Sequence, residues 1–233
     1  MEKLLMKVKL ISHTIPHGDM RETMNTPLDL VAFCARVSNP SNQMNTETSE
    51  KLINYLITHK HWSPFEMVNV CLEIETTRDI ARQILRHRSF TFQEFSQRYA
   101  DPVKEELAFE IREARLQDVK NRQNSVEVDD VDLQWEWGFL QRGVITAAQH
   151  AYTWAIDNGV AKEVARAVLP EGLTTSRMYM NGTLRSWIHY IETRTHISTQ
   201  KEHRKIALEC AKAISEIFPM INKFSHNESE HAE

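Results

Sequence analysis

The sequence predicts one α+β domain, in which a central and mostly antiparallel sheet is flanked by helices and accompanied by a long helical segment. Residues 6–12 and 68–75 alternate apolar and polar side chains, as half-buried strands do. Other stretches repeat apolar residues at the spacing of amphipathic helices. A chain of 233 residues with a hydrophobic fraction of 41% can bury a sizeable core, and it shows no internal repeat. We therefore place a single domain at residues 1–224 and a polar C-terminal tail at residues 225–233.

The first half of the chain supplies two strands and three helices. After the strand at residues 6–12, helices are expected at residues 28–37 and 46–58, followed by the strand at residues 68–75. From Asp79 onwards the apolar residues recur at helical spacing, which predicts the third helix. Every element is short enough to belong to one small sheet and its covering helices.

A charged segment and a long helix follow. Residues 101–132 are polar and poorly periodic, so we expect an excursion over the surface. The long helix is expected at residues 133–154, and its apolar stripe is interpreted as core packing rather than as a cofactor site. The stripe comprises Leu133, Trp137, Leu140, Val144, Ala147, Ala151 and Trp154.

The last third of the chain alternates helices with one strand. A short helix at residues 162–168 is expected to stop before Pro170, and residues 173–181 form a strand. The dipeptide Asn181-Gly182 is interpreted as the turn into the next helix. The final helix spans residues 199–218. In the helix after the turn, the apolar face comprises Leu184, Trp187, Ile188 and Ile191.

The overall composition argues against several classes of protein. A net charge of −4 and a pI near 6.3 oppose a general nucleic-acid binder, whose surface would be basic. The three cysteines, Cys34, Cys71 and Cys210, are far apart, lack the spacing of metal ligands and suit a reducing cytosol. No apolar run is long enough to cross a bilayer, and no signal-peptide pattern is seen. We expect a cytoplasmic protein with no nucleic-acid and no membrane partner.

Residues 86–99 concentrate the side chains that can do chemistry. Three arginines, a histidine, a glutamate and four aromatic rings lie within this stretch. The planar guanidinium of arginine can hold two phosphate oxygens at once, and aromatic rings can hold a flat heterocycle. The alternative is an exposed basic helix end followed by a loop whose phenylalanines fill the core. We expect the preceding helix either to fray before Arg88 or to present Arg88 to a buried anion.

The spacing within this stretch resembles the signature of flavin-dependent thymidylate synthases. Arg86-His87-Arg88 is followed by seven residues and Ser96, and Arg98-Tyr99 matches the usual end of the signature. Thr91 and Gln93 stand where serine and asparagine are frequent. Both replacements keep the capacity to form hydrogen bonds. Weaker matches occur in the same order along the chain, at residues 34–38, 61–66, 166–170 and 200–202, although Met67 replaces a family histidine.

The resemblance implies the flavin-dependent thymidylate synthase fold and a methyltransferase of dTMP biosynthesis, which reductively methylates dUMP to dTMP. Methylenetetrahydrofolate would supply the carbon, and NADPH would reduce a bound FAD that delivers the hydride. The chain has no Gly-rich dinucleotide fingerprint after a strand, which agrees with a family whose FAD site is not of the doubly wound type. The resemblance also implies a homotetramer whose active sites are shared among subunits.

The resemblance assigns candidate residues to each ligand. The expected FAD contacts are Ser63, Arg86, His87, Arg88, Glu94, Thr183, Arg185 and His189, the last at a position where asparagine is common. The expected dUMP contacts are Gln83, Arg86, Glu94, Phe95, Ser96, Gln97, Arg98, Arg166 and Arg194.

Two of these residues have specific roles. The resemblance implies that Arg194 is the catalytic residue, where it would stabilise negative charge on the activated uracil ring; the pKa of an arginine is too high for a general base. Ser96 is interpreted as a phosphate ligand, since no histidine–carboxylate relay is present to make it a nucleophile.

Two other classes of function compete with this one. A nucleic-acid-binding module could use the arginines at residues 78–88, but the acidic balance opposes it. A metal-dependent phosphohydrolase could use the scattered histidines, but no carboxylate–histidine spacing supports it. His59 and His61 have no acidic or cysteine partner at a ligand interval, so we expect no metal site. A yellow protein whose flavin spectrum bleaches with NADPH would favour the synthase.

Overall fold

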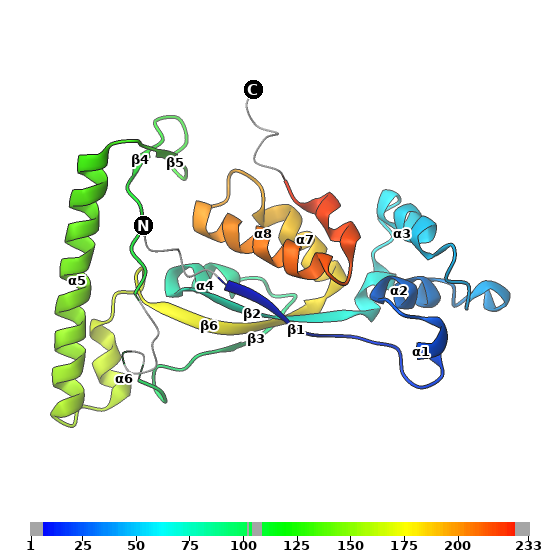
Figure 1. Cartoon of the computed structure of the whole chain (residues 1–233), viewed down its shortest axis with the longest axis horizontal. Coiled ribbons are helices and arrows are strands. Elements are labelled where there is room, and N and C mark those ends of the chain that lie inside the picture. Colours follow the sequence, from blue (N-terminus) through cyan, green and yellow to red (C-terminus); the bar gives the residue numbers. More distant parts are fainter. Residues whose placement is uncertain (1–6, 102, 104–108, 227–233) are drawn as a thin grey trace.

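The four strands of the main sheet lie in the order β1-β2-β6-β3, and each neighbouring pair is antiparallel (Figure 1). This computed structural model describes residues 7–101, 103 and 109–226. The strands are β1 (Lys7–His13), β2 (Asn69–Thr77), β3 (Thr91–Glu94) and β6 (Thr175–Thr183). β2 and β6 pair along all nine residues of each strand. The predicted α+β domain with a mostly antiparallel sheet is confirmed.

One face of the sheet carries the core. Alternation along β2 turns Val70, Leu72 and Ile74 towards this face, and all three are fully buried. The helices α4 (Arg78–Ile84), α7 (Leu184–Arg194) and α8 (Lys201–Ser215) cover it (Figure 1). Trp187 of α7 donates a hydrogen bond from Nε1 to the carbonyl of Val70 at 3.0 Å. The apolar face predicted for this helix is confirmed, because all four of its residues are buried.

Three helices form one end of the molecule (Figure 1). They are α1 (Met20–Thr23), α2 (Pro27–Ala35) and α3 (Ser49–Thr58). α2 begins next to the predicted start at residue 28, and its first turn explains why: Thr26 and Asp29 cap that turn reciprocally, and Pro27 occupies its first position. Short 3₁₀ turns at Pro40–Asn42, Ser63–Met67, Arg166–Val168 and Pro219–Phe224 complete the described helical elements.

The long helix α5 (Val131–Asp157) and the short α6 (Lys162–Ala165) form the opposite end (Figure 1). The predicted surface excursion contains a small hairpin of β4 (Arg115–Gln117) and β5 (Ser125–Glu127). Residues 102 and 104–108 of that excursion lie outside the described residues, as do residues 227–233 of the predicted tail. Among the described residues, no helix combines the length and apolar character needed to span a bilayer.

The apolar stripe of α5 is not part of this chain's core, so that interpretation is wrong. Trp137, Leu140, Val144 and Trp154 are 42%, 54%, 51% and 59% exposed. The helix instead turns a neighbouring face inward. Its buried residues are Gly138, Gln141, Ala148 and Tyr152.

The dipeptide Asn181-Gly182 is not a turn, because both residues belong to β6 and pair with Cys71 and Val70 of β2. Gly182 is instead a packing site for an aromatic ring. A Cβ atom built on Gly182 would lie 2.4 Å from Cδ1 of Phe90. The absence of a side chain therefore lets the turn after α4 approach the sheet.

We expect Gly182→Ala to destabilise the protein by about 1–3 kcal/mol, because the new methyl group overpacks the Phe90 ring. Denaturant unfolding followed by circular dichroism would measure the change. The matched control is Gly143→Ala on α5, where a Cβ would meet nothing within 4 Å. That substitution should be neutral or stabilising by up to about 1 kcal/mol, because alanine favours helices. Equal effects of the two variants would contradict the packing argument.

Candidate functional site

The signature arginines lie in the turn between α4 and β3. α4 ends at Ile84, so the predicted fraying of the helix before Arg88 is confirmed. Arg86 and Arg88 are exposed, and neither side chain has a hydrogen bond or ion pair to another described residue. Two guanidinium groups without an acidic partner suit an anionic ligand.

His87 points inward between these two arginines. Arg194, at the end of α7, donates from Nε to Nε2 of His87 at 2.9 Å. The ring of His87 also packs edge-on against Tyr190, with 4.9 Å between centroids. Burial, together with the charge of Arg194, lowers the pKa of His87 to about 4. His87 is therefore neutral at pH 7 and orients the guanidinium of Arg194 as a hydrogen-bond acceptor.

Gln83, on α4, belongs to a buried polar cluster with α7 and α8. Its Nε2 donates to Oε1 of Gln200 at 2.8 Å, and its Oε1 lies 3.3 Å from Nδ1 of His203. His203 is fully buried, and its Nε2 lies 3.2 Å from the Tyr190 hydroxyl. Burial, then the nearby charge of Arg194, lowers the pKa of His203 to about 3.

His203 is a site neighbour that the sequence reasoning missed. It lies three residues before Ile206 and seven before Cys210, both on the buried face of α8. That spacing was the available signal. The motif match at residues 200–202 predicts no contact for Gln200.

Glu94, on β3, lies in a second polar cluster. Its carboxylate accepts a hydrogen bond from Oγ of Ser176 at 3.0 Å and lies 3.7 Å from both Arg78 and Arg82. The same two arginines contact Glu171, at 3.3 and 2.9 Å respectively. The structure thus surrounds Glu94 with cations that the sequence reasoning did not assign to the site.

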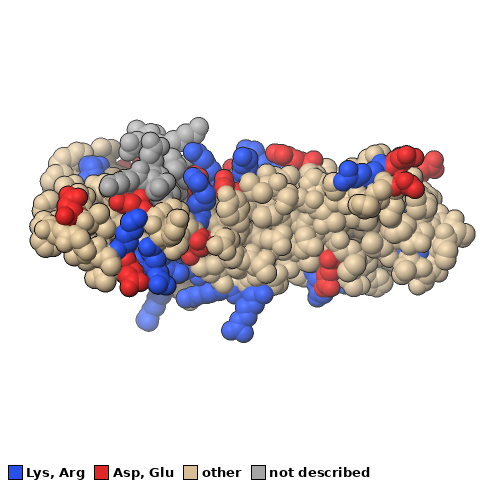
Figure 2. Space-filling model, turned by 90° about the horizontal axis from the view of Figure 1, so that it is seen from below, with Lys and Arg blue, Asp and Glu red and all other residues tan. Residues whose placement is uncertain are grey.

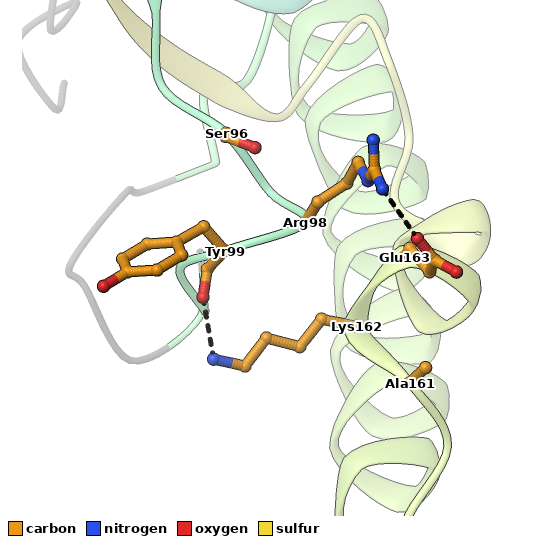
Figure 3. A pocket seen from close by; sticks show the side chains of 6 residues that line it. All are labelled: Ser96, Arg98, Tyr99, Ala161, Lys162 and Glu163. Atoms are coloured by element: carbon orange, nitrogen blue, oxygen red, sulfur yellow. Dashed lines mark hydrogen bonds and ion pairs between the residues drawn. The ribbon is translucent and has the colours of Figure 1, made fainter.

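Ser96, Arg98 and Tyr99 line an open pocket of about 460 Å³ against α6 (Figure 3). Arg98 pairs with Glu163 at 3.1 Å, and Lys162 donates to the carbonyl of Tyr99 at 2.9 Å. Arg166 donates to the backbone carbonyl of Glu163 at 3.3 Å, so Glu163 contacts two of the predicted arginines. The full lining is Ser96, Arg98, Tyr99, Ala161, Lys162 and Glu163.

The neighbours of Ser96 and Arg98 differ in burial. Phe95 is partly buried, and its backbone N–H donates to the carbonyl of Arg177 at 2.9 Å. Gln97 is 4% exposed, and its Nε2 has no hydrogen-bond partner among the described residues. A buried amide donor left unpaired is costly unless a ligand or water completes it.

The remaining predicted flavin contacts lie at the other end of β6. Thr183 caps α7 by accepting from the N–H of Ser186 at 3.2 Å, so its hydroxyl already has a structural role. Arg185 forms an ion pair with Glu66. The exposed His189 lies edge-on to Trp62, with 5.4 Å between ring centroids. The exposed Ser63 begins the 3₁₀ turn that contains Glu66.

The surface charge is distributed unevenly despite the negative total. Figure 2 shows the face below the sheet, with more Lys and Arg side chains in the half towards α5 than in the other half. Positive charge on this face is therefore concentrated towards α5. Among the described residues, no cluster of three or more histidine, cysteine, aspartate or glutamate side chains is arranged to hold a metal ion.

The family model and the relatives found by sequence agree on one family, and a solved structure shares the fold. The model of the family described as "Thymidylate synthase complementing protein" matches residues 19–220. The "Probable flavin-dependent thymidylate synthase" of Paramecium bursaria Chlorella virus 1 is 47% identical over 218 residues, covering 94% of this chain and 98% of the relative. The "Flavin-dependent thymidylate synthase" of Synechocystis is 47% identical over 216 residues, covering 93% and 97%. The UMP/dUMP methylase PolB of Streptomyces cacaoi, solved with 5-Br dUMP, shares the fold with a TM-score of 0.78 at 23% identity, covering 95% of each chain.

We expect the free energy of unfolding of the ligand-free protein to fall as the pH is lowered from about 6.5 towards about 4. In that window the unfolded chain protonates His87 and His203 while the folded chain does not, so acid favours unfolding. Each group can contribute up to about 1.4 kcal/mol per pH unit. Denaturant titrations across this range would measure the slope.

Replacing His87 by asparagine should flatten that slope. Replacing His150, which is exposed on α5, should leave it unchanged. A slope that His87→Asn does not alter would show that His87 is not held neutral by its surroundings.

Proposed function

The chain belongs to the flavin-dependent thymidylate synthases, and we propose that it makes dTMP by reductive methylation of dUMP. Methylenetetrahydrofolate is the carbon donor, and bound FAD supplies the hydride that it takes from NADPH. The observation that carries the proposal is the turn after α4. There, Arg86 and Arg88, which have no acidic partner among the described residues, flank a neutral histidine that holds Arg194 at 2.9 Å.

The residues of this chain fit a flavin dinucleotide. Arg86 and Arg88 offer guanidinium donors that have no acidic partner among the described residues, which suits a diphosphate. We assign His87, Glu94, Thr183, Arg185, His189 and Ser63 to the same ligand. Thr183 can serve through its backbone or through its second lone pair, since its hydroxyl already caps α7.

The nucleotide would occupy the space between Gln83 and the pocket at residues 96–99. Ser96, Arg98 and Arg166 bind the phosphate, for which Arg98 must exchange part of its ion pair with Glu163. A hydrogen bond to a charged group contributes roughly 1.5–3 kcal/mol, so the exchange is feasible. The Nε2 of Gln97, which has no partner in the part of the chain that the structure describes, offers a further donor. Arg86, Glu94, Phe95 and Arg194 complete the assigned pocket.

Arg194 would stabilise negative charge on the uracil ring. Its guanidinium is partly buried and oriented by the neutral His87, so little reorganisation is needed when charge develops. His87 does not act as a second cation at the uracil ring, because its pKa is about 4 and it is neutral at pH 7. The arrangement is thus a preorganised donor rather than a base.

We further propose a cytoplasmic homotetramer whose active sites are shared among subunits. The three free cysteines suit a reducing compartment. The exposed stripe of α5 adjoins an apolar pocket of about 270 Å³ that Trp137, Leu140 and Val144 line with Leu173. Contiguous apolar surface of this kind is typical of protein interfaces, and a second copy of the chain is the occupant we propose.

The function is tested by a dUMP methylation assay in which methylenetetrahydrofolate, NADPH and FAD are omitted in turn. We expect dTMP only when all are present. Arg194→Ala should lower kcat by about 100-fold or more, the usual cost of losing a preorganised donor to developing charge. Flavin absorbance should show FAD occupancy within about twofold of the unaltered protein, because Arg194 is assigned to the nucleotide and its loss removes no assigned flavin contact.

Arg194→Lys keeps the positive charge but loses the forked donors of the guanidinium. Its kcat should therefore lie between those of Arg194→Ala and the unaltered protein. An equal loss of turnover and FAD occupancy in Arg194→Ala would mean that the role assigned to Arg194 is wrong. An unaltered protein that makes no dTMP with every component present would refute the proposed reaction.

Leu140→Glu should dissociate the assembly, because a charge would be buried in the apolar interface. Sedimentation velocity would show smaller species, and methylation should fall with the loss of shared sites. Thr146→Glu introduces the same charge on an exposed position of α5 outside the stripe, and it should remain assembled. A fully active monomer would contradict the shared-site proposal.

A further inference from the structure

A chain of side-chain hydrogen bonds runs through the buried layer beneath the site. It connects Glu202, Gln200, Gln83, His203 and Tyr190 in that order. Glu202, His203 and Tyr190 are 5%, 0% and 1% exposed. Buried polar groups are costly unless paired, so each link restricts the next one.

The donor-to-acceptor direction of these hydrogen bonds is fixed at Glu202. Arg112 and Arg115 contact the Glu202 carboxylate at 3.3 and 2.7 Å. An ionised carboxylate can only accept, so the amide of Gln200 must turn its Nε2 towards Glu202, at 2.9 Å. The carbonyl of Gln200 then faces Gln83 and accepts from it at 2.8 Å.

The same logic continues through Gln83. Because its Nε2 donates to Gln200, its Oε1 is directed to Nδ1 of His203, which must carry the proton. Neutral imidazole has one donor and one acceptor, so Nε2 accepts from the Tyr190 hydroxyl. The low pKa of His203, about 3, keeps this tautomer neutral. Gln83 retains one N–H and one carbonyl lone pair for a ligand.

We propose that His203 is a positioning residue, which with Gln200 and Glu202 fixes the orientation of the Gln83 amide for nucleotide binding. The proposal rests on the placement of Gln83 in the dUMP pocket. An amide free to rotate would present its oxygen and nitrogen interchanged part of the time. Apparent affinity falls with the fraction in the competent orientation, so loss of positioning should appear in KM for dUMP.

The test compares two isosteric variants of His203 in the full enzyme with FAD. Asparagine places its amide nitrogen near the position of Nδ1, so His203→Asn keeps the donor to Gln83. Glutamine reaches the position of Nε2, so His203→Gln keeps the contact with Tyr190 and loses that donor. We expect KM for dUMP within about threefold of the unaltered enzyme for His203→Asn and about tenfold higher for His203→Gln.

Two further variants test other links of the chain. Gln200→Leu removes the acceptor for Gln83 at a partly buried position and should also raise KM about tenfold. Tyr190→Phe removes the last donor while Gln83 stays held, so KM should change by less than about threefold. In each variant kcat at saturating dUMP, FAD absorbance and Tm are recorded beside KM.

A merely structural role predicts similar losses of Tm and no difference in KM between His203→Asn and His203→Gln, and that result would overturn the proposal. If His203→Gln does not fold, an unchanged KM in Gln200→Leu would overturn it instead. Gln83→Ala distinguishes failure of the positioning proposal from failure of the proposed function. An active enzyme whose KM rises in Gln83→Ala but not in His203→Gln refutes positioning alone, whereas an unaltered enzyme that never methylates dUMP refutes the proposed function.

Discussion

The nine-residue pairing of β2 with β6 is the contact on which the rest of the site depends. The strands are antiparallel, and each runs directly into a helix, β2 into α4 and β6 into α7. The two helices therefore start at opposite ends of the strand pair, on the same face of the sheet (Figure 1). They run towards each other, which brings His87, just after α4, to within 2.9 Å of Arg194 at the end of α7. Backbone pairing thus positions two side chains that are far apart in the sequence.

The arginines of this protein act through local ion pairs rather than through a net positive charge of the whole molecule. The chain carries a net charge of −4, yet its arginines divide into those with acidic partners and those without. Glu202 is nearly buried and is held by two arginines, because an isolated buried carboxylate would be too costly. Arg86 and Arg88 remain exposed and without such partners among the described residues. An anionic ligand is the partner that this division of charge leaves open.

The sequence predicted best where one physical signal dominated. Alternation identified β2 because one of its faces is buried, and helical spacing identified the core face of α7. Asn181-Gly182 was misread, because local turn chemistry cannot reveal that Val70 pairs with Gly182 or that Phe90 packs on it. The stripe of α5 was assigned to the core because periodicity shows that a face is apolar, not what covers it. His203 was missed since its partners lie on α4 and α7, and only the tertiary fold brings these helices together.

The long helix α5 is connected to the buried chain of hydrogen bonds through Arg112. A helix of 27 residues that buries mainly small or polar residues is held weakly by its own packing. Gln141, one of those buried residues, accepts from the backbone N–H of Arg112 at 2.8 Å and donates to its carbonyl at 2.9 Å. Arg112 in turn contacts Glu202 at 3.3 Å, where the chain to Gln83 begins. The position of α5 and the orientation of the Gln83 amide are therefore linked through one arginine, so any partner that fixes α5 also restrains the start of that chain.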